Sequence, residues 1–267
     1  YDPHRRRAKR NLWYWSGEPV GLFLRDTFGR ERPLVAVDAA GALPYFSELP
    51  SLDMLGLTDH HIAHHPPHSL GKGKLAHELG DGDYVLSRKP DLVVFNTARG
   101  SAKPNWRSGR QMVRRPQFRE DYRLVTFRID GEKPMASRMW TRLEGAVGVK
   151  RTPGAVVVPG YLLSHGKKSR AHRDENGDLF LRVTEKHPGR LRKLELPPGH
   201  WEVELDSSSD DAVWRVLSAG GSELASTDTS NEFFLDEADA VTVEVRPAQD
   251  HRAVALRSVR FQHVGNR

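Results

Sequence analysis

The sequence of 267 residues contains no cysteine, which excludes disulfide bonds and any metal site built from thiolates. It also lacks an apolar run near the roughly 20 residues that span a bilayer, and its start lacks the apolar core of a signal peptide. Tyr1 stands in place of an initiator methionine, so we expect a processed product or an excised fragment. The basic run from Arg5 to Arg10 is compatible with a segment that leaves a membrane, or with a solvated run of charge.

Motifs of nucleotide, hydrolytic and nucleic-acid chemistry are missing as well. Gly71-Lys72-Gly73-Lys74 lacks the first glycine and the hydroxyl residue of a P-loop, and no G-x-G-x-x-G fingerprint follows a predicted strand. A G-x-S-x-G elbow and a Cys–His pair are both absent. Zinc-finger spacing, ribonucleoprotein aromatics and a heptad-linked basic helix are absent too. We therefore expect no cofactor and no nucleic-acid partner.

The charge that is present divides the chain. Residues 1–150 carry 25 Lys and Arg against 17 Asp and Glu, a net charge of +8, whereas residues 151–267 carry 16 against 18, a net charge of −2. Such a shift is typical of two domains with different roles. The sequence predicts one domain over 1–150 and a second over 151–267.

The first half alternates helical and strand patterns, which is typical of an α/β domain with two or three layers. The strand Asp91–Asn96 is the clearest buried run, and the strand Leu34–Val37 is its expected neighbour. Residues 99–123 are rich in arginine and irregular. The further expected elements are a helix Pro19–Thr27, a short helix within Ala39–Leu49, a strand near Leu52, a helix Ser69–Leu79, a helix Tyr84–Ser87 capped by Asp83, and a strand Leu124–Ile129.

The second half consists of short alternating runs separated by turn clusters such as Pro197-Pro198-Gly199. Many short strands without helical periodicity between them predict an antiparallel β-sandwich, jelly-roll-like and similar to a carbohydrate-binding module. The expected strands are Ala155–Val158, Leu179–Val183, Leu191–Leu196, Trp201–Leu205, Val213–Leu217, Glu232–Leu235, Val241–Val245 and Val254–Phe261.

Three segments of the first half resemble a pattern of membrane glycosyltransferases. Asp38-Ala39-Ala40-Gly41-Ala42-Leu43-Pro44-Tyr45-Phe46-Ser47 is similar to D-x-G-x-x-x-Y-x-S, and Asp53 to Asp59 is similar to D-x-x-G-L-x-D. Lys89-Pro90-Asp91 precedes an apolar strand, as in the same pattern. The chain thus resembles, over about residues 18–97, the extracytoplasmic C-terminal region of GT-C-type enzymes such as the mycobacterial terminal arabinofuranosyltransferase.

The resemblance implies an extracytoplasmic, periplasmic part of a transferase that uses a polyprenyl-phosphate sugar. The catalytic acidic residue of that family lies between early membrane helices, so no catalytic residue is assigned to this chain. Its expected role is to bind the acceptor glycan or cell-envelope polysaccharide. The missing membrane helices would hold it at the membrane, with the arginines of residues 99–123 facing anionic headgroups or donor phosphate.

Candidate sugar contacts come from both halves. Asp38 follows a predicted strand, where ligands bind in open α/β sheets, and Asp53 and Asp59 follow equivalent turns, although capping of turns and helices is the alternative role. Tyr45 lies within the first matched segment. Trp201 and Trp214 offer aromatic faces that can stack on sugar rings or fill the core of the second domain.

Five histidines gather in the first half. On a helix, His60 and His64 would share a face, and so would His61, His65 and His68. Such pairs bind metal only with a third ligand, for which Asp59 or Glu78 could serve, and the helical H-E-x-x-H glutamate is missing. We expect a polar surface turn and assign no metal ligand.

Two other classes of function stay open. The chain could be a separate periplasmic or secreted carbohydrate-binding protein. It could also be a glycoside hydrolase that uses paired carboxylates among Asp38, Asp53 and Asp59.

Overall fold

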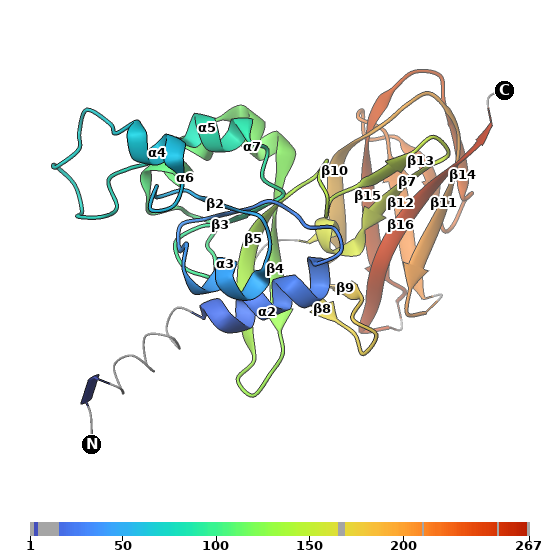
Figure 1. The fold of residues 1–267 in the computed structure, drawn as a ribbon. Coiled ribbons are helices and arrows are strands. Elements are labelled where there is room, and N and C mark those ends of the chain that lie inside the picture. Colours follow the sequence, from blue (N-terminus) through green and yellow to red (C-terminus); the bar gives the residue numbers. More distant parts are fainter. Residues whose placement is uncertain (1–2, 5–15, 165–168, 210, 250, 266–267) are drawn as a thin grey trace. The chain divides into compact units, whose positions relative to one another are not determined.

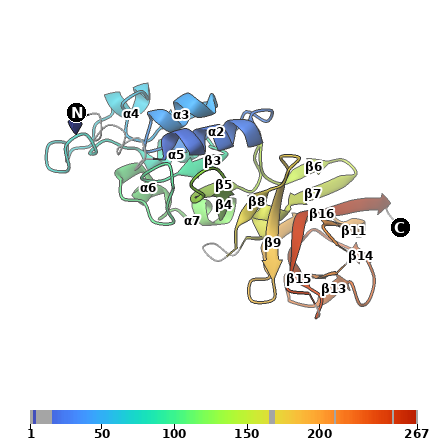
Figure 2. The ribbon, with the colours of Figure 1, turned by 90° about the horizontal axis from the view of Figure 1, so that it is seen from below.

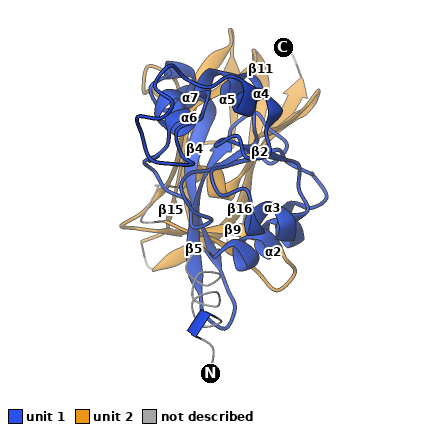
Figure 3. Ribbon diagram, turned by 60° about the vertical axis from the view of Figure 1, so that its left-hand side comes forward, with its two compact units in different colours: residues 1–147 blue, residues 148–267 orange. Residues whose placement is uncertain are grey.

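The computed structural model describes residues 3–4, 16–164, 169–209, 211–249 and 251–265 (Figure 1). The basic run from Arg5 to Arg10, predicted to follow a membrane segment, lies outside these residues. The chain divides into two compact units, residues 1–147 and 148–267, coloured separately in Figure 3. This division falls three residues before the predicted boundary at 150.

The structure is rich in β-strands, and its described helices are short and belong mainly to unit 1. The helices described in unit 1 are α2 Gly17–Phe28, α3 Ala42–Ser47, α4 His60–His64, α5 Gly82–Ser87, α6 Arg107–Met112 and α7 Pro116–Asp121. Its strands are β1 Val35–Val37, β2 Ser51–Asp53, β3 Leu92–Val94, β4 Tyr122–Ile129 and β5 Met135–Arg142.

The strands of unit 1 follow the order β2-β1-β3-β5-β4. β1 pairs in parallel with β2 on one side and with β3 on the other, whereas β5 pairs antiparallel with β3 and β4. The predicted pairing of the Leu34–Val37 and Asp91–Asn96 runs is therefore confirmed. All three residues of β1 and of β3 are buried, which explains their continuous apolar sequences.

Helices lie on both sides of the strands of unit 1, with α2 and α3 on one side and α5, α6 and α7 on the other in Figures 1 and 2. Ala36, Leu52 and Val93 form one core cluster with Met112 and Phe118 from α6 and α7. From α2, Phe23 packs on Phe127 of β4, with ring centroids 5.7 Å apart.

Unit 2 is built of antiparallel strands. One group follows the order β14-β11-β16-β9-β8, with β7 pairing β16 and β6 pairing β7, and the second follows the order β10-β15-β12-β13. Its elements are β6 Lys150–Thr152, β7 Ala155–Pro159, the 3-10 helix η1 Gly160–Leu163, β8 Ala171–Arg173, β9 Leu179–Thr184, β10 Gly189–Leu196, β11 Gly199–Ser207, β12 Ala212–Leu217, β13 Glu223–Ser226, β14 Glu232–Leu235, β15 Asp239–Pro247 and β16 Ala253–Gly265. All eight strands expected in this half are present.

Among the local predictions for unit 1, those for residues 69–79 and 99–123 are wrong. Residues 69–79 form turns and bends instead of a helix, because Gly71 and Ala76 have φ values of 86° and 62°, outside the right-handed helical region. Residues 99–123, expected to be irregular, contain α6 and α7. Burial of Met112 and Phe118 stabilises these two short helices, and such tertiary packing is not visible in local periodicity.

Candidate functional site

Polar side chains meet at the carboxyl edge of the parallel strands. Asp38 follows β1, Asp53 ends β2, and Asn96 lies two residues beyond β3. The backbone N–H of Asn96 donates to Asp38 Oδ2 over 2.6 Å. Because β2 and β3 flank β1 on opposite sides, this edge is a switch point of the topology, where open α/β sheets bind ligands.

Asp38 is the most perturbed acid of this edge. Its side chain is buried, and within the described residues Oδ1 has no hydrogen-bond partner. Burial raises the pKa of Asp38 to about 7, although the bond from the Asn96 N–H opposes the rise, and the negative charge of Asp53 adds to it. Asp38 can therefore exchange a proton near neutral pH.

Asp53 and Asp59 shape the backbone. Asp53 accepts from the N–H of Leu55 through Oδ1 at 2.9 Å and from the N–H of Thr58 through Oδ2 at 2.7 Å. Asp59 caps α4 by accepting from the N–H of Ile62 at 3.0 Å. Both carboxylates therefore make the turn and capping contacts that the sequence offered as the alternative to a role in sugar binding.

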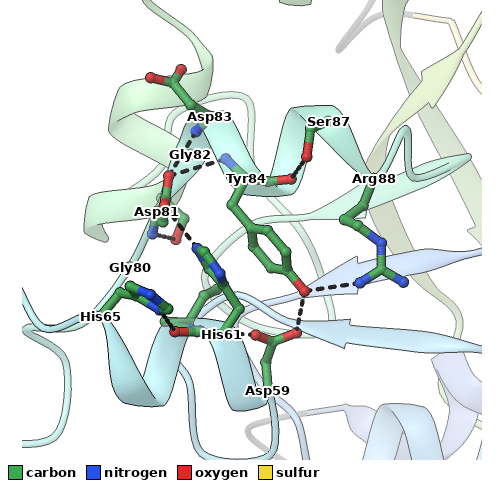
Figure 4. A network of polar contacts seen from close by, with 12 residues as sticks. Asp59, His61, His65, Gly80, Asp81, Gly82, Asp83, Tyr84, Ser87 and Arg88 are labelled. Carbon is green, nitrogen blue, oxygen red and sulfur yellow. Dashed lines mark hydrogen bonds and ion pairs between the residues drawn. The ribbon is translucent and has the colours of Figure 1, made fainter.

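A histidine, a tyrosine and two carboxylates link α4 to α5, as Figure 4 shows. The His61 ring stacks on the Tyr84 ring with centroids 3.9 Å apart, and its Nε2 lies 3.1 Å from Asp81 Oδ2. The Tyr84 hydroxyl donates to Asp59 Oδ2 at 3.1 Å and accepts from Arg88 at 2.8 Å. The network thus holds the two helices together.

The other four histidines lie at the surface. His60 stacks on His64, and His65 stacks on His61, with ring centroids 4.0 and 4.2 Å apart, while His68 lies beyond the helix. In the part of the chain that the structure describes, no group of three or more His, Cys, Asp or Glu side chains could hold a metal ion.

A basic cleft of about 550 Å³ lies between residues 69–78 and residues 105–114. We call it the basic cleft and define it by Lys72, Lys74, Arg107, Arg110 and Arg114, with Trp106, Asn105 and Glu78 also lining it. The arginines of residues 99–123 were predicted to face an anion, whereas Gly71–Lys74 lacks the pattern of a phosphate loop. That folding brings these segments together was not predicted, because a local motif carries no information on a contact between segments so far apart in the sequence.

A second cleft, of about 320 Å³, lies in unit 2 and contains Trp214. Glu185, Glu223, Asp228 and Arg246 contribute to the same lining. This lining combines a half-buried aromatic ring with carboxylates and a guanidinium.

The remaining predicted aromatic contacts differ in accessibility. Trp201 is buried, and its Nε1 donates to the carbonyl of Pro197 at 3.1 Å, so it belongs to the core of unit 2. Tyr45 on α3 is 77% exposed and packs edge-on against Phe46. Only Tyr45 and Trp214 of the predicted aromatic contacts offer a face to a ligand.

No described helix is both long and apolar enough to cross a membrane. Residues 8–146, just over half of the chain, match a family described as "Domain of unknown function (DUF8728)". No curated protein matches the sequence.

Two solved structures show a remote likeness. One is an isomalto-dextranase of Arthrobacter globiformis T6 complexed with panose, with 11% identity and a TM-score of 0.31 over 52% of this chain and 29% of that one. The other is the insecticidal delta-endotoxin Cry8Ea1 of Bacillus thuringiensis, with 13% identity and a TM-score of 0.29 over 54% of this chain and 30% of that one. The chain thus spans under a third of either structure.

Proposed function

The chain belongs to the DUF8728 family, and we propose that it is the extracytoplasmic part of a GT-C-type membrane glycosyltransferase, where it binds the acceptor glycan. In this role it works at the periplasmic face of a bacterial membrane. The catalytic base belongs to a membrane-embedded portion of the enzyme outside this chain. The resemblance of residues 18–97 to the arabinofuranosyltransferase pattern supports the assignment to such an enzyme.

The fold suits a binding role. We interpret unit 2 as an antiparallel, jelly-roll-like β-sandwich of the carbohydrate-binding-module kind, and unit 1 as a layered α/β domain. In such a sandwich, a ligand binds to side chains on strands that the sheet holds rigid, so little ordering entropy is lost on binding.

The Trp214 cleft carries the proposal of glycan binding. An indole face packs against the C–H groups of a sugar ring, while carboxylates and a guanidinium at the rim bind its hydroxyls. Pockets that bind small ligands usually combine apolar surface with a few convergent polar groups of this kind. Glu223, Asp228 and Arg246 supply those groups here.

Substitution of Trp214 tests the proposal. The backbone N–H of Trp214 donates to Thr227 Oγ1 at 2.9 Å, and β12 pairs with β15, so the strand is held without the indole. We expect Trp214→Ala to weaken binding to an array of pentose and hexose oligosaccharides by tenfold or more, the loss that aromatic hot-spot residues typically cause.

Phe180→Ala is the matched control, because Phe180 lies on β9 of the same unit and outside the lining of the cleft. It should leave glycan binding unchanged. Absence of binding to every glycan by the unaltered chain, or equal binding by the Trp214 and Phe180 variants, would contradict the proposal.

One observation favours a second candidate, a glycoside hydrolase. The raised pKa of Asp38 suits a general acid, which must hold a proton near neutral pH, but this residue is only 3% exposed, so this role also requires the site to open to a sugar. Release of reducing sugar from oligosaccharides by the isolated chain, lost in Asp38→Asn, would favour the hydrolase. Glycan binding without turnover would favour the binding role, either in the transferase or in a separate carbohydrate-binding protein.

A further inference from the structure

The basic cleft of unit 1 carries positive charge that its own carboxylate does not neutralise. Five lysines and arginines line it against one acidic residue, Glu78. Glu78 Oε1 accepts from the backbone N–H of Gly73, so this carboxylate shapes the turn of residues 73–78. Like charges gathered in one concave surface raise the local potential and attract an anion.

The arginines inside and outside the cleft differ in their partners. Arg115, which does not line the cleft, pairs through two nitrogens with the carboxylate of Asp83. By contrast, the side chains of Arg110 and Arg114 pair with no carboxylate among the residues that the structure describes. Their guanidinium donors are thus available to a ligand.

The cleft is held open by contacts that do not use these two arginines. The Trp106 ring contacts the Lys74 ammonium, 5.0 Å from its centroid, and the His77 ring, with ring centroids 4.1 Å apart, and these contacts attach residues 69–78 to the start of α6. On α6, Ser108 Oγ donates to the Met54 carbonyl at 2.8 Å. A ligand would therefore meet a site that is already formed.

The cleft is also joined to the carboxyl edge of the parallel strands. Asn105 lines the cleft, and its N–H donates to Asn96 Oδ1 at 2.8 Å. Asn96 in turn donates to Asp38. The cleft therefore lies beside the switch point of the sheet, the usual ligand position in this kind of fold.

We propose that the basic cleft binds the phosphate or diphosphate group of a ligand through Arg110 and Arg114, with Lys72 and Arg107 completing the charge. A guanidinium group binds phosphate through two parallel charge-assisted hydrogen bonds. The volume of the cleft, about 550 Å³, admits a ligand of sugar-phosphate size. The site is independent of the Trp214 cleft, so it can exist whether or not unit 2 binds glycan.

Calorimetric titration of the whole chain with inorganic pyrophosphate tests this site. We expect binding that weakens as salt is raised from 0.05 to 0.5 M, and an affinity at least tenfold lower in the double variant Arg110→Ala/Arg114→Ala. Arg119→Ala is the matched control, because it removes the same kind of charge from an exposed position outside the lining and should change the affinity less than twofold. Circular dichroism of each variant reports whether the fold is intact.

A second arm separates a soluble phosphate ligand from a lipid headgroup. Vesicles of phosphatidylglycerol and phosphatidylcholine are sedimented with the chain and its variants. Vesicle binding that the double variant loses and Arg119→Ala keeps, without pyrophosphate binding, would assign the site to a headgroup phosphate. Binding of neither probe, or equal binding of both probes by the double variant and the control, would overturn the proposal.

Discussion

The protonation of Asp38 is set by the burial of its side chain. Burial raises its pKa to about 7, from a value of 3.8 for an exposed aspartate. As the pH rises above 3.8, the unfolded chain therefore loses this proton before the folded chain does. The contribution of Asp38 to the free energy of unfolding falls across this window and reaches its lowest value above about pH 7.

Asp38→Asn should reverse this loss, because a buried amide needs no deprotonation. We expect the variant to gain stability over the unaltered chain as pH rises from 4 to 7, by about 1.4 kcal/mol per pH unit at most. Urea unfolding at a series of pH values measures the difference. Glu31→Gln, an exposed position of unit 1, should show no such trend, and a pH-independent difference for Asp38→Asn would contradict the assignment.

At the scale of elements, the start of α5 shows how a helix cap is chosen. The sequence favoured Asp83 as the cap, yet Asp81 accepts from the N–H groups of Asp83 and Tyr84 at 3.1 and 3.0 Å. Gly82 is the first residue of α5, and an added Cβ there would approach the Ser108 carbonyl to 2.5 Å. Close packing against α6 therefore fixes where α5 begins.

Removal of the cap should loosen α5. Burial raises the pKa of Asp81, but the Tyr84 N–H and His61 lower it more, so the net pKa lies below its usual value. We expect Asp81→Ala to reduce the free energy of unfolding by about 1–2 kcal/mol at pH 7.

At acid pH, the stability difference between the unaltered chain and Asp81→Ala should disappear. A lowered pKa means that the stabilisation is present above about pH 3.8 and is lost as pH falls through the lower folded value. Urea unfolding at pH 7 and pH 3 measures the difference in free energy of unfolding between the unaltered chain and Asp81→Ala, with Glu31→Ala as control. A difference that persists undiminished at pH 3 would show that the carboxylate of Asp81 does not act as the cap.

Considered as a whole, the molecule has buried aromatic residues within each of its two units. Phe118 in unit 1 packs on Tyr122 and Trp140, whereas Phe261 in unit 2 packs on Phe233. Both phenylalanines are at most 1% exposed. Each unit can therefore be weakened by a matched substitution.

Phe118→Ala and Phe261→Ala each leave a cavity in the unit that contains them. Each should lower the free energy of unfolding of that unit by about 3–5 kcal/mol. In calorimetry of the whole chain, we expect two transitions, with each variant lowering a different one. A single transition that both variants lower equally would show instead that the units unfold together.

Most of the strands were predictable from the sequence, because an apolar run or an alternating run specifies the faces that a strand must bury; β5, β6, β8 and β13 were not predicted. The runs at Val35, Leu92 and through residues 155–261 became strands for this reason. The helix α2 and the short helix α3 were predicted as well, because both depend on local properties of the backbone.

The candidate sites could not be predicted from the sequence, because burial and proximity depend on segments that are distant along the chain. The environment of Asp38 depends on Asn96, 58 residues away. Trp201 and Trp214 lie on strands of similar pattern, yet one is in the core and the other lines a cleft. The basic cleft exists only because residues 69–78 pack beside α6, a contact for which no local motif provides the information.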